Sequence, residues 1–317
     1  MKASIDSIRS KGYDKDFVPS KEYLASMPDI QNGEFDGTPI DYVGINDFHV
    51  PLKIRQKDGG TQEVIASISG MVSLAAANRG INMSRIIRTF YKSVDQVMDF
   101  DEIERVLKNY QRDLKSFDAH IQISFKYRIW QDALRTRKED LTPEGGWQYY
   151  NVTFDANLDH DGEYKKIIWF DYIYSSACPC STELSFHAFE QREVGAIPHS
   201  QRSVARIGID FKDTVWFEDI LDMCREVIPT EVLVFCKRED EQAFAELNFA
   251  NTIFVEDAIR KLHYILNKDQ RIHDFKVICS HQESLHGHNA TAVITKGIPN
   301  SCFNHHVTVG EWEAMRV

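Results

Sequence analysis

Residues 120–129, HIQISFKYRI, alternate apolar and polar side chains along their whole length. Successive side chains of an extended chain point to opposite faces, so this stretch predicts a strand with one buried and one exposed face. Residues 149–156 and 164–174 alternate in the same way, and the turn-rich residues 157–162 separate them. This arrangement predicts an antiparallel hairpin that follows the first strand.

Similar patterns extend toward both ends of the chain. Alternation with a turn at 57–60 predicts a hairpin over 41–66. Further strands are expected over 67–80, 204–211, 232–235, 275–280 and 291–295. Apolar residues at helical spacing predict helices over 81–97, 101–115, 182–191, 214–227 and 251–266. The polar segments 1–35 and 136–146 are expected to form a loosely ordered arm and a loop.

The order of these elements suggests an internal repeat. A hairpin, a strand, two helices and a strand occur once in each half of the chain. We therefore expect an α+β fold in which one unit is used twice, over 36–145 and 146–317, after the arm of residues 1–35. The halves show no sequence identity to each other, so the predicted repeat is one of architecture.

Composition narrows the possible partners. The 317 residues are 43% hydrophobic and carry a net charge of −11. This charge argues against a nucleic-acid partner, because phosphate binding needs a basic surface. With a polar N-terminus and no long apolar run, we expect a cytoplasmic protein without a membrane span. Its six cysteines are then expected to be reduced thiols.

Residues 175–203 hold the first candidate site. Cys178 and Cys180 bracket Pro179, and Ser181 is suited to cap a helix that follows. Backbone N–H groups at a helix start favour a thiolate, so a reactive or metal-bound sulfur fits here, although two buried core cysteines fit equally well. His199 stands in a polar run before a predicted strand, which is typical either of a site loop or of an ordinary solvated loop.

The other candidate segments carry imidazoles and carboxylates. His286 and His288 flank Gly287, and residues two apart in an extended segment point to the same side. Imidazoles are suited both to metal ligation and to proton transfer near neutral pH, although a histidine-rich surface loop is the alternative. The charge run 237–241 could turn one carboxylate inward, and Glu256 stands near a helix start. Without further context, both are more simply explained as solvated surface.

Together these segments resemble a known family, the prokaryotic type IB GTP cyclohydrolases, from about residue 27 to residue 290. The resemblance rests on five segments in this order: Cys178-Pro179-Cys180-Ser181, residues 198–203, residues 237–241, Phe254-Val255-Glu256-Asp257, and Glu283-Ser284-Leu285-His286-Gly287-His288. It implies two tandem tunnelling-fold units, with antiparallel sheets and helices packed on one face, assembled as a homotetramer with active sites at subunit interfaces. The implied reaction is hydrolysis of GTP, by a hydrolase acting on cyclic amidines, to 7,8-dihydroneopterin triphosphate and formate. This is the first step toward tetrahydrofolate and queuosine.

The resemblance also implies roles for individual residues. A divalent metal ion, which could be zinc, manganese or iron, would be held by Cys178, His199, Glu241 and His286. His288 would transfer protons, Cys180 would be a second functional thiol, and Glu256 would anchor the purine. The candidates for binding the triphosphate are Arg202, Arg85, Lys237 and Arg238, some of them reaching in from a neighbouring subunit.

The chain departs from the family pattern at two places. Asn82 stands where many relatives have a histidine, which puts any role of that position in doubt. The segment between Cys178 and His199 is longer than in many relatives, and we expect its extra helix to change the rim of the site or the subunit contacts.

Three other interpretations remain open on the sequence. A related nitrile reductase would use a nucleophilic cysteine and a nicotinamide, without a metal. A non-catalytic metal-binding module would bind a metal with no dependence on GTP. A redox role would form a reversible disulfide between Cys178 and Cys180, which a Cys-X-Cys step disfavours. Metal content and GTP-dependent formate release distinguish these from a cyclohydrolase.

Overall fold

The computed structural model describes residues 12–28, 35–135, 144–299 and 301–315. Its strands form one nine-stranded sheet in the order β3-β1-β2-β4-β5-β6-β7-β8-β9, with β3 parallel to β1 and every other neighbouring pair antiparallel. The strands are β1 Ile40–Arg55, β2 Thr61–Leu74, β3 Val97–Met98, β4 Ala119–Asp132, β5 Gly145–Leu158, β6 Tyr164–Ala177, β7 Ser200–Phe211, β8 Ile272–His281 and β9 Ala290–Thr295. The helices are α2 Lys21–Ala25, α3 Met83–Phe90, α4 Phe100–Leu114, α5 Pro179–Arg192, α6 Phe217–Val227, α7 Arg238–Ala250, α8 Val255–Lys268 and α9 Val309–Ala314.

The expectation of two tandem tunnelling-fold units is wrong. All nine strands belong to one continuous sheet, and β4 and β5 pair along their full length across the expected boundary at residue 145. The physical reason is that β4 and β5 bury alternate side chains in the same core. Their backbones therefore hydrogen-bond to each other, and neither strand forms the edge of a separate sheet. The division into ranges 36–145 and 146–317 therefore stays a prediction about sequence organisation only.

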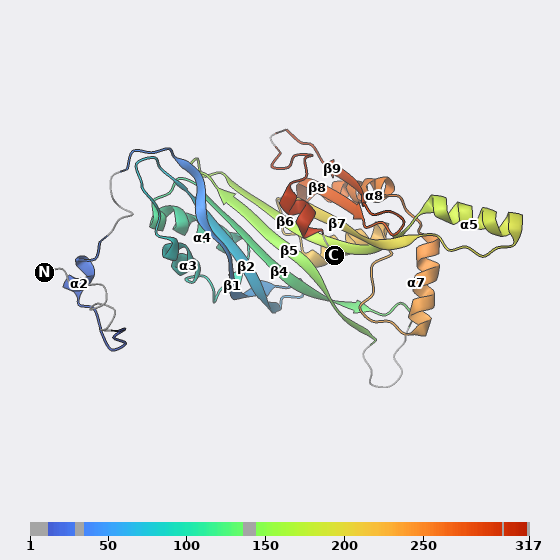
Figure 1. Ribbon diagram of the computed structural model, residues 1–317, viewed down its shortest axis with the longest axis horizontal. Helices are drawn as coiled ribbons and strands as arrows, with labels where there is room; N and C mark the ends of the chain where they lie inside the picture. Colours follow the sequence, from blue (N-terminus) through green and yellow to red (C-terminus); the bar gives the residue numbers. More distant parts are fainter. Residues whose placement is uncertain (1–11, 29–34, 136–143, 300, 316–317) are drawn as a thin grey trace.

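A single large core lies between the sheet and its helices. It draws apolar side chains from all the long strands and from α3, α4, α6 and α8. In Figure 1, α4 and α8 flank the sheet, whereas α5 projects beyond one end of it and α3 lies toward the opposite end. The core explains the alternation in β4, where Ile121, Ile123, Phe125 and Tyr127 are buried and the residues between them are exposed.

Several predicted elements are confirmed with small shifts at their ends. The hairpins become β1–β2 and β5–β6, and the strand of residues 120–129 becomes β4. The expectation of a separate strand over 67–80 is wrong, because residues 67–74 continue β2, which ends at Leu74, and residues 75–80 lie outside the strands. The helix expected over 81–97 ends at Phe90, since turns over 91–96 lead into β3.

Two further differences concern the second half. Residues 232–235 form no strand, and Glu231 makes only an isolated bridge to Tyr174. The charge run begins helix α7, which the sequence pattern did not predict because only Asp240 and Ala243 of that helix are buried. In the expected arm, α2 is capped by the side chain of Ser20, and residues 1–11 and 29–34 lie outside the described residues, as do 136–143 of the expected loop.

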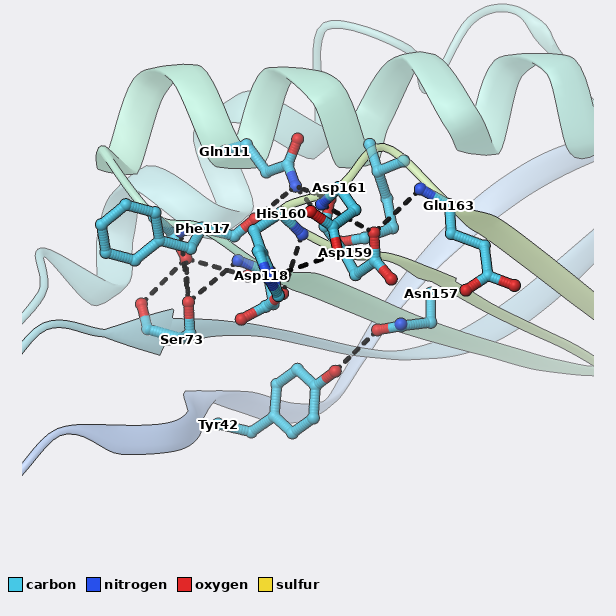
Figure 2. A network of polar contacts seen from close by, with 12 residues as sticks. Tyr42, Ser73, Gln111, Phe117, Asp118, Asn157, Asp159, His160, Asp161 and Glu163 are labelled. Atoms are coloured by element: carbon cyan, nitrogen blue, oxygen red, sulfur yellow. Dashed lines mark hydrogen bonds and ion pairs between the residues drawn. The ribbon is translucent and has the colours of Figure 1, made fainter. Parts of the chain in front are cut away.

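A polar network secures the end of the sheet that is remote from α5. The Nε2 amide of Gln111 in α4 donates to the carbonyl oxygens of Phe117, Leu158 and Asp159, at 2.6, 3.2 and 3.1 Å. Figure 2 shows these contacts together with the bond from the His160 backbone N–H to the Asp118 carboxylate, 3.0 Å long. The network ties α4 and the start of β4 to the β5–β6 turn, so both halves of the sheet are fixed to each other at this end.

The C-terminal segment crosses the face of the sheet opposite the large core. There Met315 packs on Val204 and Ile278, and the buried Lys276 ammonium contacts a carboxylate oxygen of Glu311 at 2.7 Å. Gln282 donates from its side-chain amide to the Met315 carbonyl oxygen at 2.8 Å. These contacts hold β8 close to the point where the histidine segment begins. Among the described helices, none is long and apolar enough to cross a membrane.

Candidate functional site

Cys178 is fixed at the junction of β6 and α5. Its backbone N–H donates to the His199 carbonyl oxygen at 3.1 Å, and its own carbonyl accepts from the N–H and the hydroxyl of Thr182, both at 3.0 Å. Cys178 is the N-cap of α5, and its side chain makes no capping hydrogen bond. The expectation that Ser181 caps the helix is wrong, because Pro179 occupies the first helical position, where its missing N–H costs nothing. The Cys178 thiol is therefore held in place by its backbone and left free to bind.

His199 lies beside Cys178 although the two are distant in sequence. The pairing of β6 with β7 places Ala177 opposite Ser200. His199, the residue just before β7, therefore lies next to Cys178. The Nδ1 atom of His199 lies 3.3 Å from the Gln201 side-chain oxygen and 3.4 Å from Glu283 Oε2. The structure thus brings together two of the four residues proposed as metal ligands.

The histidine segment follows β8 at the same end of the sheet. The Gln282 N–H donates to the Arg202 carbonyl oxygen at 3.2 Å, which extends the β7–β8 ladder toward this segment. His286 and His288 are exposed, and their rings stack with centroids 4.9 Å apart and planes 9° apart. The segment consists of bends and is not extended, so the rings are brought together by the turn and not by strand alternation.

Glu256 belongs to the same end of the molecule. The Ile253 N–H donates to the Ala177 carbonyl oxygen at 3.0 Å, which fixes the start of α8 next to the residue before Cys178. Glu256 is exposed in the first turn of α8. Cys180 is likewise exposed, in the first turn of α5. Both side chains are therefore open to solvent at this end of the sheet.

Glu241 lies on α7, which packs beside β6. It is exposed in the first turn, close to the exposed Lys237 and Arg238. The carboxylate of this run that turns inward is that of Asp240, which accepts from the backbone N–H groups of Arg135 at 2.7 Å and Lys237 at 3.0 Å. The buried acid therefore anchors the helix, and Glu241 is left at the surface.

Two of the predicted phosphate-binding arginines lie apart from this group. Arg85 is on α3, and its guanidinium donates to the Asp113 carbonyl oxygen at 3.4 Å. That region adjoins the start of β4, which strand pairing places at the opposite end of the sheet from Cys178. Arg202 is exposed and alternates with Gln201 along β7, so it points to the opposite face of the sheet from His199. Within one chain, Arg85 cannot reach a ligand bound near Cys178.

A metal ion would find only part of its ligand set here. Within residues 12–28, 35–135, 144–299 and 301–315, no three His, Cys, Asp or Glu side chains gather closely enough to hold one. The residues at the β6–β7 end nevertheless have suitable donor chemistry, with a free thiol beside an imidazole. Glu283 Oε2 is buried there without a hydrogen bond. Cys178 and His199 therefore supply only part of a metal site, and further ligands must come from outside this cluster.

Helix α5 and the irregular segment after it form a projecting arm, residues 179–198. Several of its apolar side chains are exposed, and Ile197 is 92% exposed. A groove of about 300 Å³ runs between the arm and the end of α7, lined by Phe186, Phe189, Ile197 and Phe249 among others. Phe186 and Phe249 meet edge to face at 5.6 Å, which attaches the arm to α7.

Sequence reasoning missed Gln201 and Glu283 as parts of this site. Gln201 follows His199 by two residues at the start of a strand, and this spacing alone indicates a shared face. Glu283 begins the motif that ends in His288, but only the folded chain shows that its carboxylate faces His199.

The sequence matches known proteins over most of its length. The family model described as type I GTP cyclohydrolase FolE2 matches residues 27–292. GTP cyclohydrolase FolE2 of Cereibacter sphaeroides is 48% identical over 295 residues, covering 91% of this chain and 80% of that protein. FolE2 of Paracoccus denitrificans is 45% identical, covering 91% and 89% of the two chains. Among solved structures, uricase from Arthrobacter globiformis is similar with a TM-score of 0.49 and 8% identity, covering 88% of this chain and 98% of that one.

The chain belongs to the type I GTP cyclohydrolase FolE2 family. This membership favours the cyclohydrolase interpretation over the nitrile reductase and the non-catalytic metal-binding module.

Proposed function

We propose that this chain hydrolyses GTP to 7,8-dihydroneopterin triphosphate and formate, as a member of the type IB branch. Its family membership makes it a GTP cyclohydrolase. The observation that carries the proposal for the site is the pairing of Cys178 with His199 at one end of the sheet. The start of α8 and the His286–His288 segment adjoin the same end, so purine-binding and proton-transfer groups are available there.

A divalent metal ion, zinc, manganese or iron, is part of the proposal, with Cys178, His199, Glu241 and His286 as its ligands. Sulfur, imidazole and carboxylate donors suit all three metals, so the choice among them is left to experiment. When bound, such an ion supplies a coordinated water whose pKa falls to about 7. Because the described residues of one chain leave this set incomplete and place Arg85 at the far end of the sheet, we include assembly as a homotetramer with sites between subunits.

The protein residues have separable tasks in this proposal. His288 protonates nitrogen 7 of the purine while carbon 8 is attacked, as a general acid near neutral pH. The Glu256 carboxylate accepts hydrogen bonds from the purine N–H groups and orients carbon 8 toward the nucleophile. Cys180 is a second thiol beside the reacting centre. The triphosphate is bound by Lys237 and Arg238, and by Arg202 and Arg85 from a neighbouring subunit.

The test is anaerobic purification with elemental analysis, followed by incubation with GTP and detection of formate. We expect a stoichiometric divalent metal and GTP-dependent formate release that stops when the metal is removed by a chelator. Formate release that continues unchanged in demonstrably metal-free protein would refute the metal part. No formate from metal-loaded protein would refute the activity. A cytoplasmic location and service to folate or queuosine synthesis follow from the same proposal.

A further inference from the structure

A line of polar side chains runs inward from His199 along one face of β6 and β7. The Gln201 amide nitrogen donates to Ser176 Oγ at 2.8 Å, and Ser176 Oγ lies 2.8 Å from Ser203 Oγ. Both serines are fully buried, so their hydroxyls have no access to water. Buried polar groups of this kind hold fixed positions because losing a partner leaves them unsatisfied. The buried serines therefore hold the Gln201 side chain in a fixed position beside His199.

The Gln201 amide presents its oxygen, not its nitrogen, to the imidazole. With its nitrogen donating to Ser176, its oxygen is turned to His199 Nδ1, 3.3 Å away. The Glu283 Oε2 atom lies 3.4 Å from the same nitrogen, as an ion-pair contact without a hydrogen bond, and the Glu283 side chain is only 12% exposed. Both oxygens are acceptors, so the interaction is favourable only when Nδ1 carries the proton.

A neutral imidazole carries one N–H. When that proton is on Nδ1, the lone pair is on Nε2, the nitrogen that neither oxygen touches. The His199 backbone is at the same time held next to Cys178 by the bond between the Cys178 N–H and the His199 carbonyl. The ring is thus fixed in tautomer as well as in place.

We propose that Gln201 is a positioning residue that, together with Glu283, holds His199 as the Nδ1–H tautomer and leaves Nε2 as its ligand-binding atom beside Cys178. The proposal rests on the proposed function in that the ligand is a divalent metal ion. Partners that hold the second nitrogen of a metal-binding histidine commonly change metal affinity about 10- to 100-fold when they are removed. We expect an effect of this size from Gln201.

The experiment uses full-length protein stripped of metal, with Zn²⁺ as the probe in competition with a chromophoric chelator. Gln201→Leu has a side chain one bond shorter that cannot accept from Nδ1, and we expect its zinc affinity to fall about 10- to 100-fold. Gln201→Glu restores an acceptor, so its affinity should stay near that of the unchanged protein. Gln282→Leu is the matched control, because Gln282 is also a partly buried glutamine and its side chain bonds to Met315 instead of His199.

A second measurement reads the ring directly and without metal. In protein labelled with nitrogen-15 histidine, the His199 signals, assigned with His199→Gln, should show a protonated Nδ1 and an unprotonated Nε2. Gln201→Leu should mix the two tautomers, whereas a loss of general stability would leave them unchanged. Equal zinc affinity for Gln201→Leu and the unchanged protein would overturn the proposal, as would a protonated Nε2 in the unchanged protein. If the unchanged protein binds no zinc, the metal part of the proposed function fails, and the nitrogen-15 result alone decides the role of Gln201.

Discussion

Tyr174 of β6 and His281 of β8 meet across β7, with the Tyr174 hydroxyl oxygen 3.0 Å from His281 Nε2. The residue between them on β7 is Ser203, whose small side chain leaves room for the contact. Both rings are buried. Burial raises the pKa of Tyr174 well above its usual value, so the phenol keeps its proton and can donate it to the imidazole. Burial also lowers the pKa of His281 to about 4, so this histidine is neutral in the folded protein at neutral pH.

This contact predicts a specific loss of stability in acid. An unfolded histidine binds a proton below about pH 6.5, whereas folded His281 does so only near pH 4, so the unfolded state gains protons first as the pH falls. The contribution of neutral His281 to the free energy of unfolding is fully present above pH 6.5. It decreases by about 3 kcal/mol between pH 6.5 and 4. Urea unfolding at several pH values measures it. His281→Gln should accept from Tyr174 without titrating, and an equally steep acid loss in this variant would contradict the assignment.

Variants of Cys178 and His288 are expected to lose different properties, metal binding in the first case and proton transfer in the second. Cys178→Ala should lose both bound metal and turnover, because the thiol fixed beside His199 is removed. His288→Ala should keep its metal and lose turnover by about 10²- to 10⁴-fold, the usual contribution of a general acid. Elemental analysis and formate release measure the two properties. Cys302→Ala is the control for loss of a thiol remote from the site. A His288→Ala protein that loses metal but regains full activity on reconstitution would reverse the roles.

Glu256 is expected to act in substrate binding. Its carboxylate is exposed at the start of α8, beside the end of β6, and would accept from the purine N–H groups. Because hydrogen bonds to charged groups contribute about 1.5–3 kcal/mol, Glu256→Ala should raise the dissociation constant for GTP about 10- to 100-fold. Equilibrium binding of GTP to the metal-loaded protein measures the change. The neighbouring Asp257→Ala removes an acid paired with Arg260 at 3.0 Å and should change little, and an equal effect of both variants would argue against a specific purine anchor.

The projecting arm is expected to pack on a second copy of the chain. Ile197 is almost fully exposed in one chain, yet it lines an apolar groove next to the residues of the candidate site. Burying such a side chain contributes about 1.5–3 kcal/mol, so Ile197→Asp should weaken assembly at least about tenfold. Analytical ultracentrifugation over a concentration series measures the effect, with Ile197→Val as the conservative control. If Ile197→Asp assembles as tightly as Ile197→Val, the arm is not part of the subunit contact.

The strands were predictable because their side chains alternate over long stretches, as in β4, and one face of each is buried in the common core. Helix α7 was not predictable, because few of its residues are buried. One of the buried residues is Asp240, and a charged side chain usually indicates a surface position. The single sheet was also not predictable, since alternation gives the faces of a strand but not the neighbours along its edges. For the site, motifs identified Cys178 and His199, whereas the Gln201–Ser176–Ser203 line depends on strand register that only the fold supplies.

The full-length pairing of β4 with β5 has a consequence for how such a chain can change in evolution. Each strand has 14 residues, and separating the halves would bare two long edges at once. Bare edges of this length recruit other strands and lead to aggregation. Neither half can therefore be inherited, lost or exchanged as an independent module, and recombination within this gene is expected to be tolerated only outside the β4–β5 seam.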